Sequence, residues 1–294
     1  MPESSVPTRP PEEYLAELRQ NGYTVLDNVV GTEALARIRE ATQSRVKSMD
    51  PAPPDFDDRF GVPDIIAWSA DACRAVVHPV ALWLMRSYLG SEAIRFCHQP
   101  AMTVLRPARS LIGQFPASGW HSDYPYHHDV FPDDRWQDDA IYGVQYNICI
   151  DAFRADNGAT QFIPNSFRQR SLPPRALNQA GTRMGQPPHE HAMQMLAPAG
   201  SALIYDSRTW HRACPELNVS GQDRLAILNA VCPAWVRPMS DMARGAEAYR
   251  NSNIPAALDE RVEAEIHRLC LGETAPAPPG APEILPKGRV GLAL

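Results

Sequence analysis

The chain has no long hydrophobic run. None of its apolar stretches approaches the ~18 residues that a membrane-spanning helix requires, and the opening segment, Met1 to Pro10, lacks the apolar core of a signal peptide. Positive charge is not in surplus either, since 28 Lys and Arg face 34 Asp and Glu, a formal net charge of -6. These absences argue against a membrane or nucleic-acid partner, and nothing in the sequence indicates an obligate protein partner. We expect a cytoplasmic protein.

Closely spaced cysteines are also missing. The six cysteines are widely scattered and include no Cys-x-x-Cys pair. This spacing favours buried, reduced thiols over disulfides or a zinc site.

The composition allows one sizeable core. With 294 residues, of which 44% are hydrophobic, the chain can fold as a single domain. We predict a disordered lead over residues 1–10, a single domain over 11–270, and a Pro-rich tail over 271–294.

Apolar residues at helical spacing predict helices near both ends of this domain. The expected helices cover residues 11–19, 32–47 (capped by Thr32), 79–89 (stopped by Gly90) and parts of 240–270. In the third of these we expect Val80, Trp83, Leu84 and Ser87 to face inward. Residues 50–58 hold prolines and acids and are expected to form a loop.

The middle of the chain has β character. Short apolar or alternating runs predict strands at 23–26, 94–97, 102–105, 142–150, 160–163, 203–205 and 225–231. Short strands with irregular connections favour a double-stranded β-helix, a relative of the jelly roll, over residues 94–238. The predicted fold class is therefore mainly β (α+β), with flanking N- and C-terminal helices.

One His-x-Asp pair stands out within this β region. Residues two apart in a strand point the same way, so His121 and Asp123 can both reach one ion. A distant single histidine, His211, completes the sequence form of a 2-His-1-carboxylate triad. Such a triad holds non-haem Fe(II) on one face and leaves other positions open for O2 and a co-substrate.

A basic residue follows the last of these three residues. Arg224 opens an apolar strand, and its guanidinium can offer two parallel donors to a carboxylate. A dicarboxylate such as 2-oxoglutarate needs a pair of donors of this kind for the carboxylate at its far end. The rivals Arg208 and Arg212 flank His211, but strand alternation points them away from the metal side.

These pieces together resemble the phytanoyl-CoA dioxygenase-like family of Fe(II)/2-oxoglutarate oxygenases. The matching segments are Trp120-His121-x-Asp123, the run 156–166 (DNGATQFIPNS), and His211 with Asn218-x-Ser220 and Arg224. The similarity covers roughly residues 15–238. It implies a dioxygenase that uses Fe(II), 2-oxoglutarate and O2 to oxidise a small-molecule substrate, most simply by hydroxylation.

The resemblance also assigns roles within the site. It implies that His121, Asp123 and His211 bind iron and that Arg224 and Thr160 hold the co-substrate. In related halogenases a small residue replaces the carboxylate, so Asp123 disfavours halogenation. Two positions depart from the family pattern: Ser118 stands where many relatives have Gln, and Ala213 where many have a hydroxyl.

The substrate pocket is less defined. Tyr124, Tyr126 and Trp210 lie next to the ligands and are candidates for its walls. No basic cluster is visible near the site, which favours a small metabolite or natural-product intermediate over a CoA thioester. Two alternatives remain: a cupin-like metalloenzyme with the same triad but no 2-oxoglutarate, which would not need Arg224, and a non-catalytic binding protein of the same fold.

Overall fold

A computed structural model of the chain describes residues 6–52, 59–107, 119–126, 130–131, 135–137, 139–175, 177 and 190–271. Its helices are α1 (Pro11–Asn21), α2 (Thr32–Lys47), α3 (Ala70–Val76), α4 (Pro79–Leu89), α6 (Ala243–Arg250) and α7 (Glu260–Cys270). Its strands are β1 (Tyr23–Leu26), β2 (Arg59–Val62), β3 (Ile94–Phe96), β4 (Ala101–Leu105), β5 (Val144–Cys149), β6 (Gln161–Phe162), β7 (Met193–Gln194), β8 (Ala202–Asp206), β9 (His211–Arg212), β10 (Arg224–Leu228) and β11 (Ala230–Pro233). Short 3-10 turns are η1 (Ile65–Ala67), η2 (Ser166–Arg168), η3 (Pro215–Leu217) and η4 (Pro255–Ala257).

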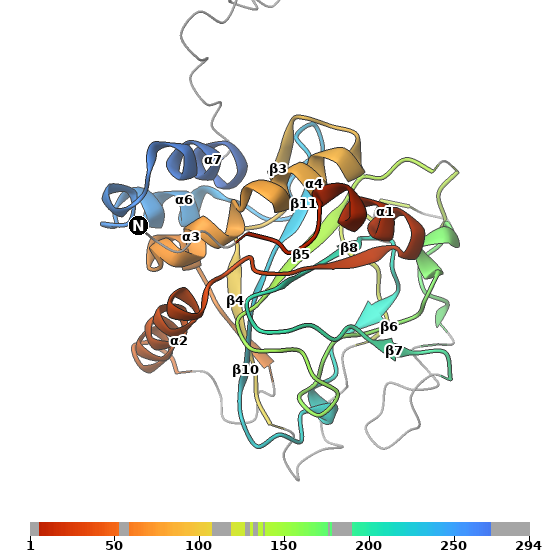
Figure 1. Ribbon diagram of the computed structural model, residues 1–294, viewed down its shortest axis with the longest axis horizontal. Coiled ribbons are helices and arrows are strands. Elements are labelled where there is room, and N and C mark those ends of the chain that lie inside the picture. Colours follow the sequence, from red (N-terminus) through yellow and green to blue (C-terminus); the bar gives the residue numbers. More distant parts are fainter. Residues whose placement is uncertain are drawn as a thin grey trace, which may run out of the picture.

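The strands form two antiparallel sheets. An 8-stranded sheet has the order β1-β8-β5-β10-β4-β2, with β11 paired to β5 and β3 paired to β11, and a 3-stranded sheet has the order β7-β6-β9. Figure 1 shows α3, α4, α6 and α7 grouped along one side of the large sheet and β6 and β7 on the other. The predicted mainly β core with flanking helices is confirmed. Within the described residues the sheets do not close into a barrel.

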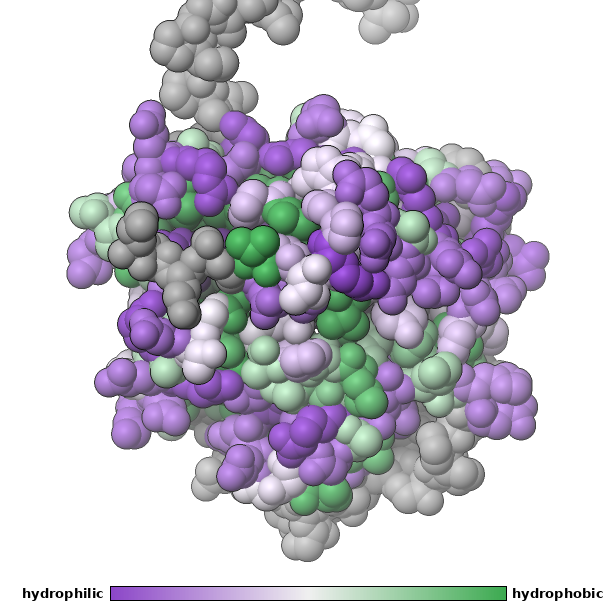
Figure 2. Space-filling view, in the orientation of Figure 1, coloured by the Kyte–Doolittle hydropathy of each residue, from purple (hydrophilic) through white to green (hydrophobic). Residues whose placement is uncertain are grey.

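Two apolar layers hold this arrangement together. The larger lies between the helices and the large sheet and includes Tyr14, Leu84, Tyr146 and Ile204. The smaller lies between the two sheets and contains Cys149, Phe153, Ala159, Phe162, Met195, Ala197, Leu203, Tyr205 and Ala226. Every residue of β5 is buried, because this strand is covered on both faces. The surface in view in Figure 2 is hydrophilic over α1 and α7 and more apolar toward its middle.

The helix α4 has the predicted bounds, but the residues that it turns toward the core are not the predicted ones. The buried residues are Ala81, Leu82, Leu84, Met85 and Tyr88, whereas Trp83 is 38% exposed. Of the predicted inner residues, Leu84 alone is central to the core. The helix is apolar on most of its circumference, so hydrophobicity could not orient it.

The start of the chain also differs from the prediction. Thr8 donates its backbone N–H to Asp27 at 2.7 Å, and Arg9 pairs with Glu17 at 2.9 Å, so the disordered lead is wrong for residues 6–10. Thr32 is the first residue of α2 and not its cap, which is Gly31. The tail over 272–294 and residues 53–58 of the predicted loop lie outside the described residues.

The strand predicted at 225–231 is split by Asn229. Its side chain donates to the Tyr146 carbonyl at 2.8 Å, and Tyr146 donates its N–H back to the Asn229 carbonyl at 2.8 Å. β10 and β11 nevertheless pair with β5 in one continuous antiparallel register along the same edge, and β8 pairs with the other edge. All six cysteines are buried and unpaired, as expected. No helix in the part of the chain that the structure describes has both the length and the apolar character of a membrane span.

Candidate active site

The two segments that carry the histidines lie side by side. His121 and His211 form an antiparallel bridge, with reciprocal backbone hydrogen bonds of 3.0 Å. Asp123 donates its N–H to the Ser207 carbonyl at 2.8 Å, which extends the pairing. The predicted meeting of His121 and Asp123 with a distant strand is thus found in the structure.

Three side chains converge at this pairing. One ligand atom from each of His121, Asp123 and His211 lies within 4.8 Å of the others. The His211 Nε2 atom is 3.1 Å from one Asp123 oxygen, and the His121 Nε2 atom is 3.8 Å from the other. Two imidazoles and one carboxylate are the donor set of the facial triad, so the geometry fits a divalent transition metal.

Backbone carbonyls fix the orientation of both rings. The Nδ1 atom of His121 lies 2.8 Å from the Gly119 carbonyl, and that of His211 lies 2.9 Å from the Thr209 carbonyl. Each Nδ1 therefore carries the proton and donates it, which leaves Nε2 facing the other ligands. This arrangement is typical of metal-binding histidines.

The charges of the three residues are coupled. Burial raises the pKa of Asp123, but the neighbouring His211 and His121 outweigh it and hold the pKa at about 2. Burial lowers the pKa of His211, yet Asp123 outweighs it and the net shift is upward. For His121, burial and the charge of His211 lower the pKa. The upward shift favours protonation of His211 beside Asp123 in the metal-free protein, and a metal ion bound at Nε2 would replace that proton.

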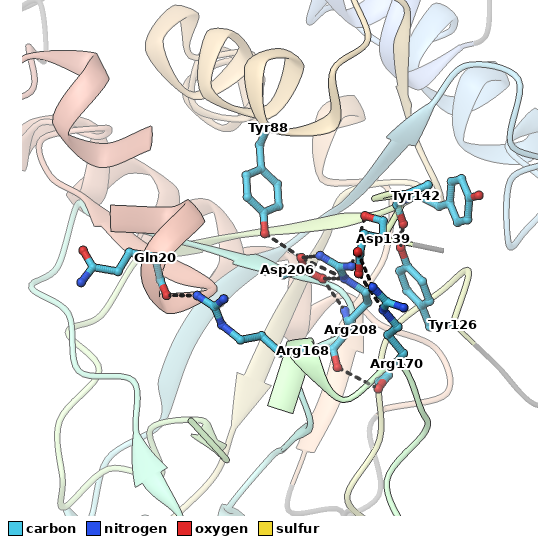
Figure 3. Close-up of polar contacts among 11 residues, drawn as sticks. Gln20, Tyr88, Tyr126, Asp139, Tyr142, Arg168, Arg170, Asp206 and Arg208 are labelled. Carbon is cyan, nitrogen blue, oxygen red and sulfur yellow. Dashed lines mark hydrogen bonds and ion pairs between the residues drawn. The ribbon is translucent and has the colours of Figure 1, made fainter. Parts of the chain in front are cut away.

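A buried cluster supports the turn that leads into His211. Asp206, at the end of β8, is fully buried and accepts hydrogen bonds from the Tyr88 hydroxyl at 2.6 Å and from the Arg208 Nη2 at 2.6 Å. Figure 3 shows Tyr88 reaching down from α4 to this pair, beside the more peripheral pair Asp139–Arg170. The Arg208 carbonyl in turn accepts from Ser122, between two of the ligands, at 3.2 Å.

Arg224 is buried, and no acid among the described residues forms an ion pair with it. The residue is 7% exposed, and its Nε and Nη1 atoms have no hydrogen-bond partner. The guanidinium lies 3.8 Å from the centre of the Phe153 ring, and burial lowers its pKa to about 10. Buried polar groups are almost always paired, so two unpaired donors on one guanidinium fit a missing carboxylate.

The two rival arginines are already occupied. Arg208 is held by Asp206, as described above. Arg212 donates to Gln161 at 2.9 Å and pairs with Glu216 at 2.7 Å. Neither guanidinium is therefore available to a co-substrate, and the direction predicted for the two side chains stays a prediction.

The other family segments shape the approach to Arg224. Asn218 donates its side-chain amide to the Leu105 carbonyl at 3.2 Å and accepts from the Ser220 hydroxyl at 2.6 Å. Gly158 lies against it with a φ of +74°, where an added Cβ would come within 2.5 Å of Leu105 and 2.7 Å of the Cys214 carbonyl. These residues therefore hold the turn before β10 instead of contacting a ligand themselves.

The predicted pocket residues do not all reach the site. Tyr126 is fully buried against Trp136 and Leu172, and its hydroxyl donates to the Ala140 carbonyl at 3.0 Å. It has no surface to offer a substrate, so that prediction is wrong. Trp210 is half-buried and donates its indole N–H to the Ser171 carbonyl at 2.8 Å. Its place in a pocket stays a prediction.

Tyr124 and Thr160 are better placed. Tyr124 follows Asp123 directly, and its hydroxyl donates to the Arg237 carbonyl at 2.6 Å. Thr160 is half-buried and precedes β6, where alternation puts it on the face of Phe162, the residue paired with His211. Ser118 lies outside the described residues.

Sequence reasoning missed three polar residues around the centre. Leu105 of β4 is paired with Arg59 of β2 on one side and with Arg224 of β10 on the other. Both arginines therefore share one face of the sheet. Tyr205 packs edge-on against the His211 ring at 5.1 Å between centroids and accepts from Asn147 at 3.1 Å. Tyr205 and Asn147 lie in predicted strands, but alternation alone did not mark them as polar residues facing the metal.

Comparison with known proteins gives a family. A family model described as phytanoyl-CoA dioxygenase (PhyH) matches residues 18–226, which include His121, Asp123, His211 and Arg224. The chain is 26% identical over 275 residues to a protein of Aspergillus fumigatus named dioxygenase af480, covering 88% of this chain and 76% of that protein. It is also 25% identical over 240 residues to an uncharacterized protein of Mycobacterium tuberculosis, covering 79% of this chain and 72% of that protein.

Solved structures share the fold at lower identity. HygX from Streptomyces hygroscopicus, with nickel, 2-oxoglutarate and hygromycin B bound, superposes with a TM-score of 0.58 at 14% identity, covering 78% of this chain and 89% of that one. The epimerase SnoN, in complex with Fe3+, alpha ketoglutarate and nogalamycin RO, gives a TM-score of 0.54 at 17% identity, covering 80% and 89%. These likenesses confirm the jelly-roll fold predicted from the strand pattern.

Proposed function

The chain belongs to the phytanoyl-CoA dioxygenase (PhyH) family, and on that premise we propose that it is a non-haem Fe(II)- and 2-oxoglutarate-dependent dioxygenase. The proposed reaction hydroxylates an unactivated C–H bond of a small metabolite or natural-product intermediate, with release of succinate and CO2. Residues 11–270 form the oxygenase domain in this proposal. The six unpaired cysteines support the reducing cytoplasm as its compartment.

The observation that carries the proposal is the unpaired guanidinium of Arg224. A metal site alone would fit many hydrolytic or redox enzymes. A buried arginine with two unsatisfied donors, on the sheet that packs over the metal centre, calls for a carboxylate ligand as well. The cupin-like alternative needs no such residue, and a non-catalytic binding protein would not need all three metal ligands.

Each residue then has a defined task. His121, Asp123 and His211 hold Fe(II) through their converging ligand atoms. Arg224 pairs with the distal carboxylate of 2-oxoglutarate, and the Thr160 hydroxyl is a second donor to the co-substrate. Tyr124 forms part of the substrate wall. The metal and co-substrate supply the oxidising chemistry with O2 when bound, and the protein supplies orientation and a site shielded from water.

The relatives suggest the kind of substrate. HygX is seen with hygromycin B, and SnoN is an epimerase from nogalamycin biosynthesis. Both ligands are elaborate natural products, which supports a natural-product intermediate as substrate. Because SnoN is an epimerase, the outcome at the substrate carbon is the part of this proposal that most needs measurement.

The test is a screen for substrate-triggered succinate release. Purified protein is incubated with Fe(II), 2-oxoglutarate and O2 against a panel of metabolites, and succinate and products are measured by mass spectrometry. We expect at least one compound to raise succinate release and to gain one oxygen atom, with no release by His211→Ala. Turnover that proceeds equally without 2-oxoglutarate would favour the cupin-like alternative.

A further inference from the structure

A cleft that is rich in arginine lies near Tyr124, whose hydroxyl donates to the carbonyl of one of its lining residues, Arg237. It has a volume of about 770 Å³ and is lined by Arg95 of β3, residues 237–243, and Ala246, Arg250 and Leu271. Three of its lining residues are arginines and one, Asp241, is acidic. The cleft is thus positive although the chain carries a net charge of -6.

Two of these arginines have no acidic partner in the described part of the chain. The Nε atom of Arg95 is buried without a hydrogen-bond partner. Arg237 is exposed and forms no ion pair with the described residues. The single acid of the lining, Asp241, accepts the N–H of Ala243 at 2.8 Å at the start of α6. The guanidinium groups of Arg95 and Arg237 are therefore available to an anionic ligand.

Another cleft of the same molecule shows what a balanced site looks like. A cavity of about 320 Å³ beneath α2 and α3 is lined by three arginines, Arg37, Arg74 and Arg261, and by three acids, Glu33, Asp71 and Asp259. Here Arg37 pairs with Asp71 at 2.7 Å, and Arg74 pairs with the same carboxylate at 3.3 Å. Arg37 and Arg74 of the smaller cleft are thus balanced by an acid, whereas no acid of the described residues pairs with Arg95 or Arg237 in the larger cleft.

The larger cleft is linked to the metal centre through Tyr124. This residue follows Asp123, packs against Cys97 and Cys232, and donates its hydroxyl to the carbonyl of Arg237, a lining residue. Met239, another lining residue, donates its N–H to the Cys97 carbonyl at 2.8 Å.

From this arrangement we infer that the cleft binds an oxyanion group of the substrate, a carboxylate or a phosphate, while the carbon to be oxidised lies at the metal centre. The inference rests on the proposed function, because it takes the ligand of the cleft to be the substrate of that reaction. Arg95 and Arg237 supply the charged donors. Met239, which is 56% exposed, offers an apolar contact to the part of the substrate next to the anionic group.

Binding of simple anions tests the cleft directly. Metal-free full-length protein is titrated calorimetrically with pyrophosphate and with citrate at constant ionic strength. We expect at least one of them to bind, and the stronger one indicates whether phosphate or carboxylate is preferred. Arg95→Gln and Arg237→Gln should each weaken binding about tenfold, as expected for the loss of one charged hydrogen bond.

Two further variants serve as matched controls. Arg45→Gln removes an exposed arginine from α2, away from the cleft, and should leave the affinity unchanged. Arg224→Met removes the proposed co-substrate partner, so binding that persists in it cannot come from that site. Two results would overturn the inference. One is that the wild-type protein binds neither anion; the other is that Arg95→Gln and Arg237→Gln, with thermal unfolding like that of the wild type, both bind the anions as tightly as the wild type does.

A kinetic comparison connects the cleft to turnover. Active acids or phosphates from the succinate screen are compared with their neutral methyl esters. The anionic forms should be preferred, and Arg237→Gln should raise their KM about tenfold with kcat nearly unchanged. Equal use of acid and ester by the wild type would contradict the inference. If the wild type instead fails to bind Fe(II) and 2-oxoglutarate, the proposed function fails, while the anion titration still decides the cleft.

Discussion

Replacing Arg224 by Met should change affinity and stability in opposite directions. In the protein without co-substrate, the guanidinium is 7% exposed and two of its nitrogens are unpaired. An unsatisfied buried donor costs about 1–3 kcal/mol, whereas the contact with Phe153 returns about 0.5–2 kcal/mol. We therefore expect Arg224→Met to be as stable as the wild type or more stable by about 1–2 kcal/mol.

The affinity for 2-oxoglutarate should fall sharply in the same variant. Loss of one partner of a desolvated charge pair costs about 2–5 kcal/mol, which is roughly a 30- to 4,000-fold rise in Kd. The assay is an anaerobic titration of the iron-loaded protein with 2-oxoglutarate, together with thermal unfolding with and without the ligands. Iron affinity should be nearly unchanged, because Arg224 is not a metal ligand.

Arg212→Met is the matched control. This arginine is also buried, at 5% exposure, but its partners Gln161 and Glu216 are in place. Its removal leaves the half-buried Glu216 and the buried Gln161 without their partner, so stability should fall by about 1–3 kcal/mol. Wild-type affinity for 2-oxoglutarate in Arg224→Met would refute the reasoning and direct attention to Arg59 on the same face of the sheet.

Three further predictions concern the support of the site. Asp206→Asn should lower stability by about 3–5 kcal/mol and weaken iron binding through His211, as measured by denaturant unfolding and metal titration. The control Asp139→Asn, in the exposed pair with Arg170, should change stability by less than about 1 kcal/mol. Equal effects of these two changes would contradict the role given to the buried cluster. Gly158→Ala should destabilise by about 2 kcal/mol or more, because the residue has a φ of +74° and no room for a Cβ; unchanged unfolding would show that the turn can shift. Iron affinity should fall as the pH drops below the raised pKa of His211, approaching about tenfold per pH unit, because the metal must displace that proton; a pH-independent affinity would mean that His211 is not protonated in the metal-free protein.

The pair His211 and Asp123 should make the stability of the metal-free protein depend on pH. The contribution of His211, whose pKa is raised in the fold, is fully present below the unfolded value of 6.5 and is lost as the pH rises through the folded pKa. The contribution of Asp123 is present above 3.8 and is lost as the pH falls toward about 2. Thermal unfolding across this range should show the metal-free protein weakening at high pH while the iron-loaded protein does not.

Local patterns in the sequence predicted most elements and three side chains that converge in the structure. His121 and Asp123 are two apart in the chain, and this spacing lets both side chains turn toward one point. Pro79 and Gly90 mark the ends of α4 because each has a strong backbone preference at a helix terminus. Arg224 could be chosen over its rivals from alternation and from its place at the start of an apolar strand.

Features that depend on tertiary packing could not be predicted in this way. The inner face of α4 was wrong because the helix is apolar nearly all round, and Tyr126 was misassigned because an aromatic residue near a ligand can pack into the core. The arginines of the larger cleft come from β3, the segment after β11, and α6, so the sequence shows no basic cluster although the fold makes one.

Binding of Fe(II) and 2-oxoglutarate together tests the central claim most directly. Anaerobic protein that receives both should develop the visible charge-transfer absorption of a 2-oxo acid chelated to iron, at one equivalent of each. His211→Ala should bind no iron and show no such band, and Arg224→Met should bind iron but need far more 2-oxoglutarate. Absence of the band in the wild type, or an undiminished band in His211→Ala, would contradict the assignment of the triad and of the co-substrate.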